Sequence, residues 1–97
     1  MNTIEFKPEV YDDIKTAYDW YESQRVGLGE DFLLTLEESY AKIVRTPKLY
    51  QLIYKTVRRK LVRRFPYGVF FTLRDDKIIV IAVLHTKSNP VMWNERA

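Results

Sequence analysis

The sequence predicts an α+β fold, in which helices are grouped before a run of antiparallel strands. Between Pro8 and Thr46, apolar residues recur every three or four positions in two successive stretches, as they do in amphipathic helices. After Pro47 this spacing gives way to alternating or unbroken apolar stretches, which are typical of strands. Helices that precede a group of strands along the chain indicate an α+β protein. We therefore expect a β-α-α-β-β-β order in one domain that spans residues 1–97.

The first strand and a helical hairpin make up the first half of the chain. Residues 3–7 alternate apolar and polar side chains up to a proline, which predicts a short, half-buried strand. Residues 8–25 form the first helical pattern, with acids weighted toward its first turns. The Gly-Leu-Gly segment at residues 27–29 separates it from a second pattern that starts at Phe32 and stops at Thr46, before a proline. Two helices joined by so short a segment predict an αα-hairpin.

The second half of the chain predicts a meander of three strands in a twisted antiparallel sheet. Residues 49–54 form a mixed apolar stretch, and the first two strands are expected at residues 57–64 and 67–73. Residues 74–77 are polar and supply a hairpin turn. Residues 78–84 are apolar at every position, so we expect this strand near the centre of the sheet, covered on both faces or lying at an interface.

The composition is that of a folded, cytoplasmic protein. Ninety-seven residues are enough for one hydrophobic core, and 46% apolar with 30% charged residues is ordinary for a globular domain. Because the chain has no cysteine, a disulfide framework, a thiolate metal site and a thiol nucleophile are all excluded. No apolar segment approaches the length of a signal peptide or a membrane span, so we expect no membrane partner.

Charge is distributed unevenly along the chain. The formal net charge is +3, yet residues 8–46 hold nine acids against four bases, whereas residues 55–64 hold six bases and no acid. Such a local positive field favours a polyanion or an acidic protein as partner. The alternative interpretation is a solvated strand whose charges prevent aggregation.

Three segments together resemble the RelE/ParE toxin superfamily of bacterial type II toxin–antitoxin systems. They read WYESQRVGLGEDFLLTLEE at residues 20–38, VRRKLVRRFPYGVFF at residues 57–71 and IAVLHTKSNPVMW at residues 81–93. The resemblance spans nearly the whole chain. It implies a helical hairpin packed on a twisted sheet, no cofactor, and inhibition by a co-expressed antitoxin. The WYE and GLG elements are closer to ParE-like members of the plasmid stabilisation branch, which implies binding and poisoning of DNA gyrase rather than an enzymatic reaction.

Two other interpretations remain open at this stage. RelE-like members of the superfamily cut messenger RNA on the ribosome, and the residues available for such a metal-independent reaction are His85, Arg64 and Arg63, with Lys87 beside them. The usual family tail resembles His-x-x-Arg-x-Pro-x-x-Trp, but Ser88 stands where the arginine is common, and no C-terminal tyrosine follows. The other alternative is a degenerate module that binds antitoxin without toxicity. A metal site is not expected, because the single histidine has no second histidine or cysteine to join it.

A basic surface is the predicted site for binding target or antitoxin. Strand alternation predicts Arg58, Lys60 and Arg64 on one face, and Arg59 and Arg63 on the other. Because a strand beneath helices is apolar on its covered face, Arg59 or Arg63 should lie beyond the helices or pair with a helix acid such as Glu37 or Glu38. Trp93 is expected as a lid on the core, unless exposure makes it a partner contact. The predicted binding residues are Arg58, Arg59, Lys60, Arg63, Arg64, Lys87 and Trp93.

Overall fold

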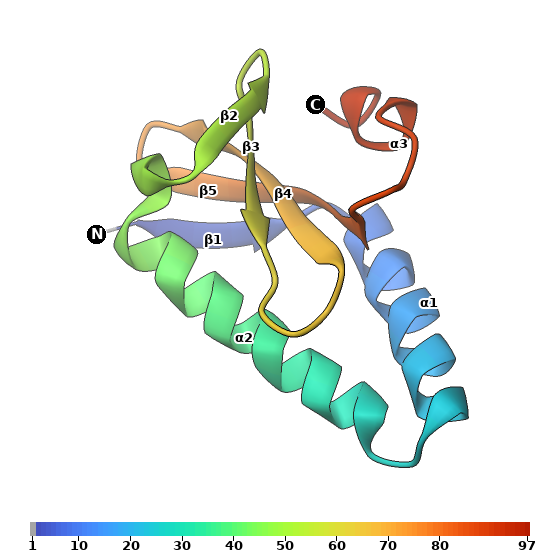
Figure 1. Ribbon diagram of the computed structural model, residues 1–97. Helices are drawn as coiled ribbons and strands as arrows, with labels where there is room; N and C mark the ends of the chain where they lie inside the picture. Colours follow the sequence, from blue (N-terminus) through green and yellow to red (C-terminus); the bar gives the residue numbers. More distant parts are fainter. Residues whose placement is uncertain (1) are drawn as a thin grey trace.

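The computed structural model describes residues 2–97 and has the predicted α+β architecture (Figure 1). The helical hairpin covers one face of a single sheet, and a short C-terminal helix lies on the other face (Figure 1). In chain order the elements are β1 (Thr3–Phe6), α1 (Glu9–Gln24), α2 (Leu28–Arg45), the 3-10 helix η1 (Pro47–Leu49), β2 (Gln51–Tyr54), β3 (Val57–Leu61), β4 (Tyr67–Arg74), β5 (Lys77–His85) and α3 (Val91–Asn94). No helix among residues 2–97 is both long and apolar enough to span a bilayer.

The predicted αα-hairpin is confirmed, and its Gly-Leu-Gly turn is held by one carboxylate. Glu22, near the end of α1, accepts hydrogen bonds from the backbone N–H of Gly27 (2.9 Å) and of Gly29 (3.0 Å). Gly27 has φ +91°, a left-handed conformation that favours glycine. A Cβ atom on Gly29 would lie 2.7 Å from the ring of Tyr18, so glycine is needed for the close approach of the two helices. This turn allows α2 to begin at Leu28, before its first apolar repeat.

The sheet has five strands in the order β1-β5-β4-β3-β2, and one of them was missed by the sequence prediction. The meander formed by β3, β4 and β5 is confirmed. No strand was predicted in the mixed apolar stretch at residues 49–54, but this stretch contains strand β2, which pairs with β3 and makes the meander one of four strands. Three of its four residues are exposed and its register shifts between Leu52 and Tyr54. A short, exposed edge strand of this kind lacks the alternation by which strands are found in a sequence.

The sheet is mixed rather than wholly antiparallel. Strand β1 pairs with β5 in parallel, with Ile4 opposite Ile78 and Phe6 opposite Val80. Strands joined by a short turn are antiparallel by necessity, but β1 reaches β5 only after the whole intervening chain, so no turn fixes its direction. An exposed ion pair between Glu5 and Lys77, with 3.6 Å between Oε2 and Nζ, accompanies this pairing.

Apolar side chains fill both sides of the sheet. The core beneath the hairpin contains Val10, Ala17, Phe32, Leu36, Ile43, Val69, Phe71, Ile78, Val80 and Val83. The smaller core on the outer face contains Val57, Phe70, Ile81, Ala82, Leu84 and Trp93. Strand β5 contributes to both and lies between β1 and β4. This confirms the prediction that the unbroken apolar strand is covered on each face.

Candidate functional site

The basic run extends beyond strand β3 into the loop at residues 62–66. The prediction that the strand continues to Arg64, which would place that residue on a face with Arg58 and Lys60, was wrong, because β3 ends at Leu61. In the loop, Val62 and Phe65 both turn into the core, and Arg64 adopts φ +74°. Burial of two apolar side chains three positions apart is incompatible with strand alternation, so the chain leaves the sheet here.

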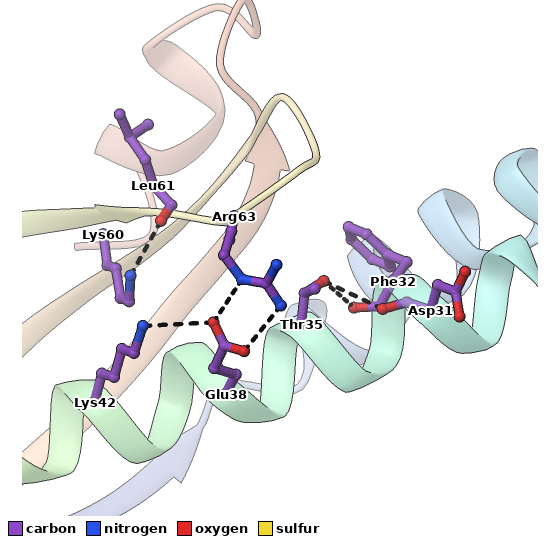
Figure 2. Close-up of polar contacts among 8 residues, drawn as sticks. All are labelled: Asp31, Phe32, Thr35, Glu38, Lys42, Lys60, Leu61 and Arg63. Atoms are coloured by element: carbon purple, nitrogen blue, oxygen red, sulfur yellow. Dashed lines mark hydrogen bonds and ion pairs between the residues drawn. The ribbon is translucent and has the colours of Figure 1, made fainter.

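Arg63 and Arg64 are both directed toward acids of helix α2. Nε and Nη2 of Arg63 each donate to a different carboxylate oxygen of Glu38 at 3.0 Å (Figure 2), which confirms the predicted pairing with a helix acid. Nζ of Lys42 lies 3.4 Å from the same carboxylate. The Arg63 hydrogen bonds are the main cause that lowers the pKa of Glu38 to about 2. Arg64 lies farther from its acid, with 3.8 Å between its Nη2 and Oδ2 of Asp31.

Arg58 and Lys60 lie on the helix-side face of β3 and are half-buried. Nη1 of Arg58 donates to the backbone carbonyl oxygens of Tyr50 (2.7 Å) and Lys48 (3.3 Å), so this guanidinium fastens the turn that leads into β2. Nζ of Lys60 lies 5.4 Å from the centre of the Tyr50 ring, a cation–π distance. Burial, followed by the nearby charge of Lys42, lowers the pKa of Lys60.

Arg59 lies on the opposite face of β3, beyond the helices, as the sequence prediction allowed. In the register of the sheet it is opposite Phe70, a residue of the outer core. Its aliphatic stem lies over Gly68, where an added Cβ would be 3.0 Å from both Cγ and Cδ of Arg59. Gly68 was not among the predicted site residues, although a glycine inside a strand is a known sign of close approach.

His85 ends strand β5 and faces Tyr67 across the sheet. The two rings meet edge to face, with 5.5 Å between their centres, and Nδ1 of His85 accepts a hydrogen bond from the Lys87 N–H at 3.0 Å. A neutral His85 with this bond carries its proton on Nε2. His85 and Tyr67 line a cavity of about 260 Å³ together with Asp13 and Ser88.

The predicted catalytic residues are not joined into one cluster. Within residues 2–97, no hydrogen bond or ion pair links His85 to Arg63 or Arg64: the arginines contact α2, and the histidine contacts its own loop. The side chain of Lys87 is exposed. In the same part of the chain, no three His, Cys, Asp or Glu side chains are grouped as a metal site would require.

Trp93 is the lid on the outer core that the sequence predicted. Its side chain is only 7% exposed and stacks on Phe70, with 5.3 Å between ring centres, while Tyr54 meets it at 6.0 Å. Trp93 therefore presents little of its own surface to a partner and instead holds α3 against the sheet.

An ion pair that fastens the C-terminus was not anticipated. Nη1 and Nη2 of Arg96 donate to the two carboxylate oxygens of Asp13 at 2.6 and 3.1 Å, and Nη1 also donates to the carbonyl oxygen of Ile81 at 3.1 Å. Oδ2 of Asp13 further accepts the backbone N–H of Val83 at 3.1 Å. Because 83 positions separate the two charged residues, no local pattern could have indicated the pair.

Comparison with known proteins agrees with this architecture. The structure resembles a solved structure of the chromosomal ParDE toxin–antitoxin system from P. aeruginosa, with a TM-score of 0.78 and 13% identity over 88% of this chain and 96% of that one. It also resembles the isolated E. coli RelE toxin, with a TM-score of 0.67 and 13% identity over 98% of this chain and 95% of that one. At such low identity these similarities show the fold alone.

The sequence itself identifies the family. The family model described as the ParE toxin of the type II toxin–antitoxin system parDE matches residues 4–90, which is most of the chain. Comparison with curated proteins gives no match. The matched residues include helices α1 and α2, strands β2 to β5 and all of β1 except Thr3, and they end before α3. The chain therefore belongs to the ParE toxin family, within the RelE/ParE superfamily, of type II toxin–antitoxin systems.

Proposed function

We propose that this protein is a toxin that binds DNA gyrase and traps its cleaved-DNA state, and that a cognate antitoxin blocks it. The observation that carries the proposal is the match of residues 4–90 to the ParE toxin family, whose members belong to type II systems and so imply an antitoxin partner. On this proposal the protein acts by binding and catalyses no reaction of its own. Its target places that action in the cytoplasm.

The arrangement of the basic residues supports binding over RNA cleavage. Cleavage of RNA without a metal needs a general base, a general acid and cations gathered around one phosphate. Here Nε and Nη2 of Arg63 already donate to Glu38, and Nδ1 of His85 already accepts the backbone N–H of Lys87. These groups are therefore engaged within the protein and are not gathered around one phosphate. Ser88 occupies the position where the superfamily tail commonly has an arginine that could hold a phosphate with two hydrogen bonds.

A gyrase cleavage assay tests the proposal. Purified gyrase, supercoiled plasmid and ATP are incubated with increasing amounts of the protein, and covalently trapped, linearised plasmid is measured after protease and detergent treatment. We expect linear plasmid to accumulate with added protein and to disappear when the antitoxin encoded beside the gene is added first. A reaction without gyrase controls for nuclease contamination.

A parallel reaction separates the alternatives. The protein is incubated with ribosomes that carry a defined messenger RNA, and the 5′ ends of the products are mapped. Cuts in the ribosomal A site, lost in His85→Ala or Arg64→Ala, without trapped plasmid in the gyrase assay, would overturn the gyrase proposal in favour of a ribonuclease. If neither assay responds and cells grow normally while expressing the protein without antitoxin, the degenerate module is the correct interpretation.

A further inference from the structure

Arg59 differs from the other arginines of the basic run because it has no partner within the part of the chain described, residues 2–97. Arg58 donates to two backbone carbonyl groups, Arg63 forms two hydrogen bonds with Glu38, and Arg64 lies near Asp31. Among the same residues, no hydrogen bond or ion pair involves the guanidinium of Arg59. Arg59 therefore keeps its hydrogen-bonding capacity for another molecule, on the face that the hairpin leaves uncovered.

Gly68 leaves room for the aliphatic part of the Arg59 side chain to pack against the sheet. The Cγ and Cδ atoms of Arg59 lie where any side chain larger than hydrogen at position 68 would need space, 3.0 Å from the place of a Cβ atom. Phe70, two residues along β4, is 3.4 Å from the same point. The stem of Arg59 is thus held against the sheet, so less side-chain entropy is lost when the guanidinium binds.

Several exposed apolar side chains lie on the same side of the sheet as Arg59, the side that α3 covers. Leu61, two positions along β3 and opposite Gly68, is 55% exposed, and Met92 on α3 is 46% exposed. Tyr54 is 41% exposed and contacts Trp93, which in turn stacks on Phe70, the residue opposite Arg59. We call Tyr54, Arg59, Leu61 and Met92 the outer-face patch. An arginine and a tyrosine among apolar side chains are the composition of an energetically important protein interface.

Charge indicates what kind of partner fits this patch. Residues 47–97, which form nearly all of the sheet, contain eleven Lys and Arg residues against three acids, whereas most of the acids lie in the hairpin. A nucleic acid is bound mainly through many cation–phosphate contacts. The outer-face patch has a single free guanidinium, and its other members are apolar or aromatic, so it suits a nucleic acid poorly. The complementary surface is that of a protein that presents a carboxylate beside apolar side chains.

We propose that the outer-face patch is the surface with which this toxin meets the gyrase protein, and that Arg59 pairs with a gyrase carboxylate. This inference rests on the proposed function and adds to it the residues in contact and the chemistry of their partner. Gly68 acts as a positioning residue, because it touches Arg59 and not the target. The apolar members pack around the ion pair and exclude water from it.

The test compares the potency of variants in the gyrase cleavage assay and their binding to gyrase without DNA. Arg59→Ala removes the anchor, Gly68→Ala displaces it, and Arg45→Ala is the matched control, because it deletes an exposed arginine at the end of α2, away from the patch. Circular dichroism and thermal unfolding establish that each variant is folded. We expect Arg59→Ala to need about tenfold more protein for half-maximal trapping. Arg45→Ala should stay within about twofold of wild type, the scale of a surface substitution.

The role of Gly68 is tested in a double-mutant cycle. Gly68→Ala should weaken binding to gyrase by itself and add little in the Arg59→Ala background, because the displaced side chain is then absent. A purely structural effect of Gly68→Ala would instead persist in that background and would overturn the positioning role. If Gly68→Ala unfolds the protein, Arg59→Lys replaces it in the test: loss of the planar fork should weaken binding even though the charge remains.

The remaining outcomes separate this inference from the proposed function. If wild-type protein traps plasmid and Arg59→Ala does so equally well, the patch is not the gyrase surface, although the proposed function stands. If Arg59→Ala loses only its inhibition by antitoxin, or only an affinity for DNA alone, then a different partner occupies the patch and the inference is wrong. If wild-type protein traps no plasmid, the proposed function fails and gyrase is withdrawn as the partner.

Discussion

Two arginines in this protein hold a carboxylate in the same forked geometry, one in the interior and one at the surface. Arg96 binds Asp13 at 2.6 and 3.1 Å, and their side chains are 17% and 8% exposed. Arg63 binds Glu38 at 3.0 Å through both nitrogens, and their side chains are 58% and 36% exposed. Water can replace either partner in the second pair but not in the first, so equal geometry should carry unequal consequences for stability.

The interior pair also completes the sheet. Strand β1 pairs with β5 only as far as Val80, with a last bond from the Lys7 N–H to the Val80 carbonyl oxygen. Beyond that point, β5 has a bulge at Ile81, because Phe70 is opposite Ala82 while Phe71 is opposite Val80. Arg96 binds the Ile81 carbonyl group and Asp13 binds the Val83 N–H. Beyond the end of β1, these two side chains therefore supply hydrogen bonds to the backbone of β5. The pair therefore satisfies backbone groups of β5 that β1 does not reach, and it holds the C-terminus against α1.

Asp13→Ala should produce the largest effect. It removes the carboxylate that accepts hydrogen bonds from the Arg96 guanidinium and from the Val83 N–H, and we expect the free energy of unfolding to fall by about 3 kcal/mol. Urea unfolding followed by circular dichroism measures the change. Hydrogen exchange should show that the Val83 amide loses its protection.

The neighbouring residue provides the control. Asp12 lies in the first turn of the same helix and is exposed, so Asp12→Ala should change the free energy of unfolding by only about 0.5 kcal/mol, through the helix dipole. If Asp13→Ala and Asp12→Ala were equally mild, the interior pair would have no special weight, and the contrast with the surface pair would disappear.

Arg96→Lys sharpens the comparison by keeping the charge and removing the fork. A lysine cannot reach both carboxylate oxygens and the Ile81 carbonyl group together, so we expect a loss of about 1.5 kcal/mol in the free energy of unfolding. Protection of the Val83 amide should persist, because Asp13 still accepts its hydrogen bond. Arg63→Lys is the matched change at the surface and should leave the urea midpoint unchanged. A larger effect at Arg63 than at Arg96 would contradict the assignment of interior and surface roles.

The parts of the fold that were predicted correctly are those with a strong local pattern. Helices α1 and α2 were predicted from their repeats, and the meander of β3, β4 and β5 from its apolar runs and polar turn, since each pattern reflects burial of one element. The short helices η1 and α3 have no such repeat and were not predicted. Strand β2 has no such pattern, because it is an exposed edge whose neighbour β3 supplies the pairing. The parallel direction of β1 follows from how distant segments meet, which local burial does not encode.

The candidate site shows the same division. The pairing of Arg63 with Glu38 could be anticipated, because a charged residue near a helix-covered face needs an acid from that helix. The end of β3 at Leu61 could not be anticipated, because the strand stops where Val62 and Phe65 both turn into the core. The free guanidinium of Arg59 could be recognised only once the partners of the other arginines were known.

The smallest effect expected is at the surface pair, and it is best seen by titration. The pKa of Glu38, lowered from 4.5 to about 2 chiefly by its hydrogen bonds with Arg63, can be followed by NMR of its carboxyl carbon. Because the folded-state pKa lies below the unfolded one, the pair stabilises the fold above about pH 4.5 and loses this contribution as the pH falls toward 2. Arg63→Ala should return the pKa most of the way to 4.5, and Lys42→Ala should raise it less, since Lys42 makes a single contact at 3.4 Å. A Glu38 pKa that does not respond to Arg63→Ala would mean that the forked pair does not persist in solution, as many surface ion pairs do not, and the interior pair would then be the only one of the two that holds its geometry.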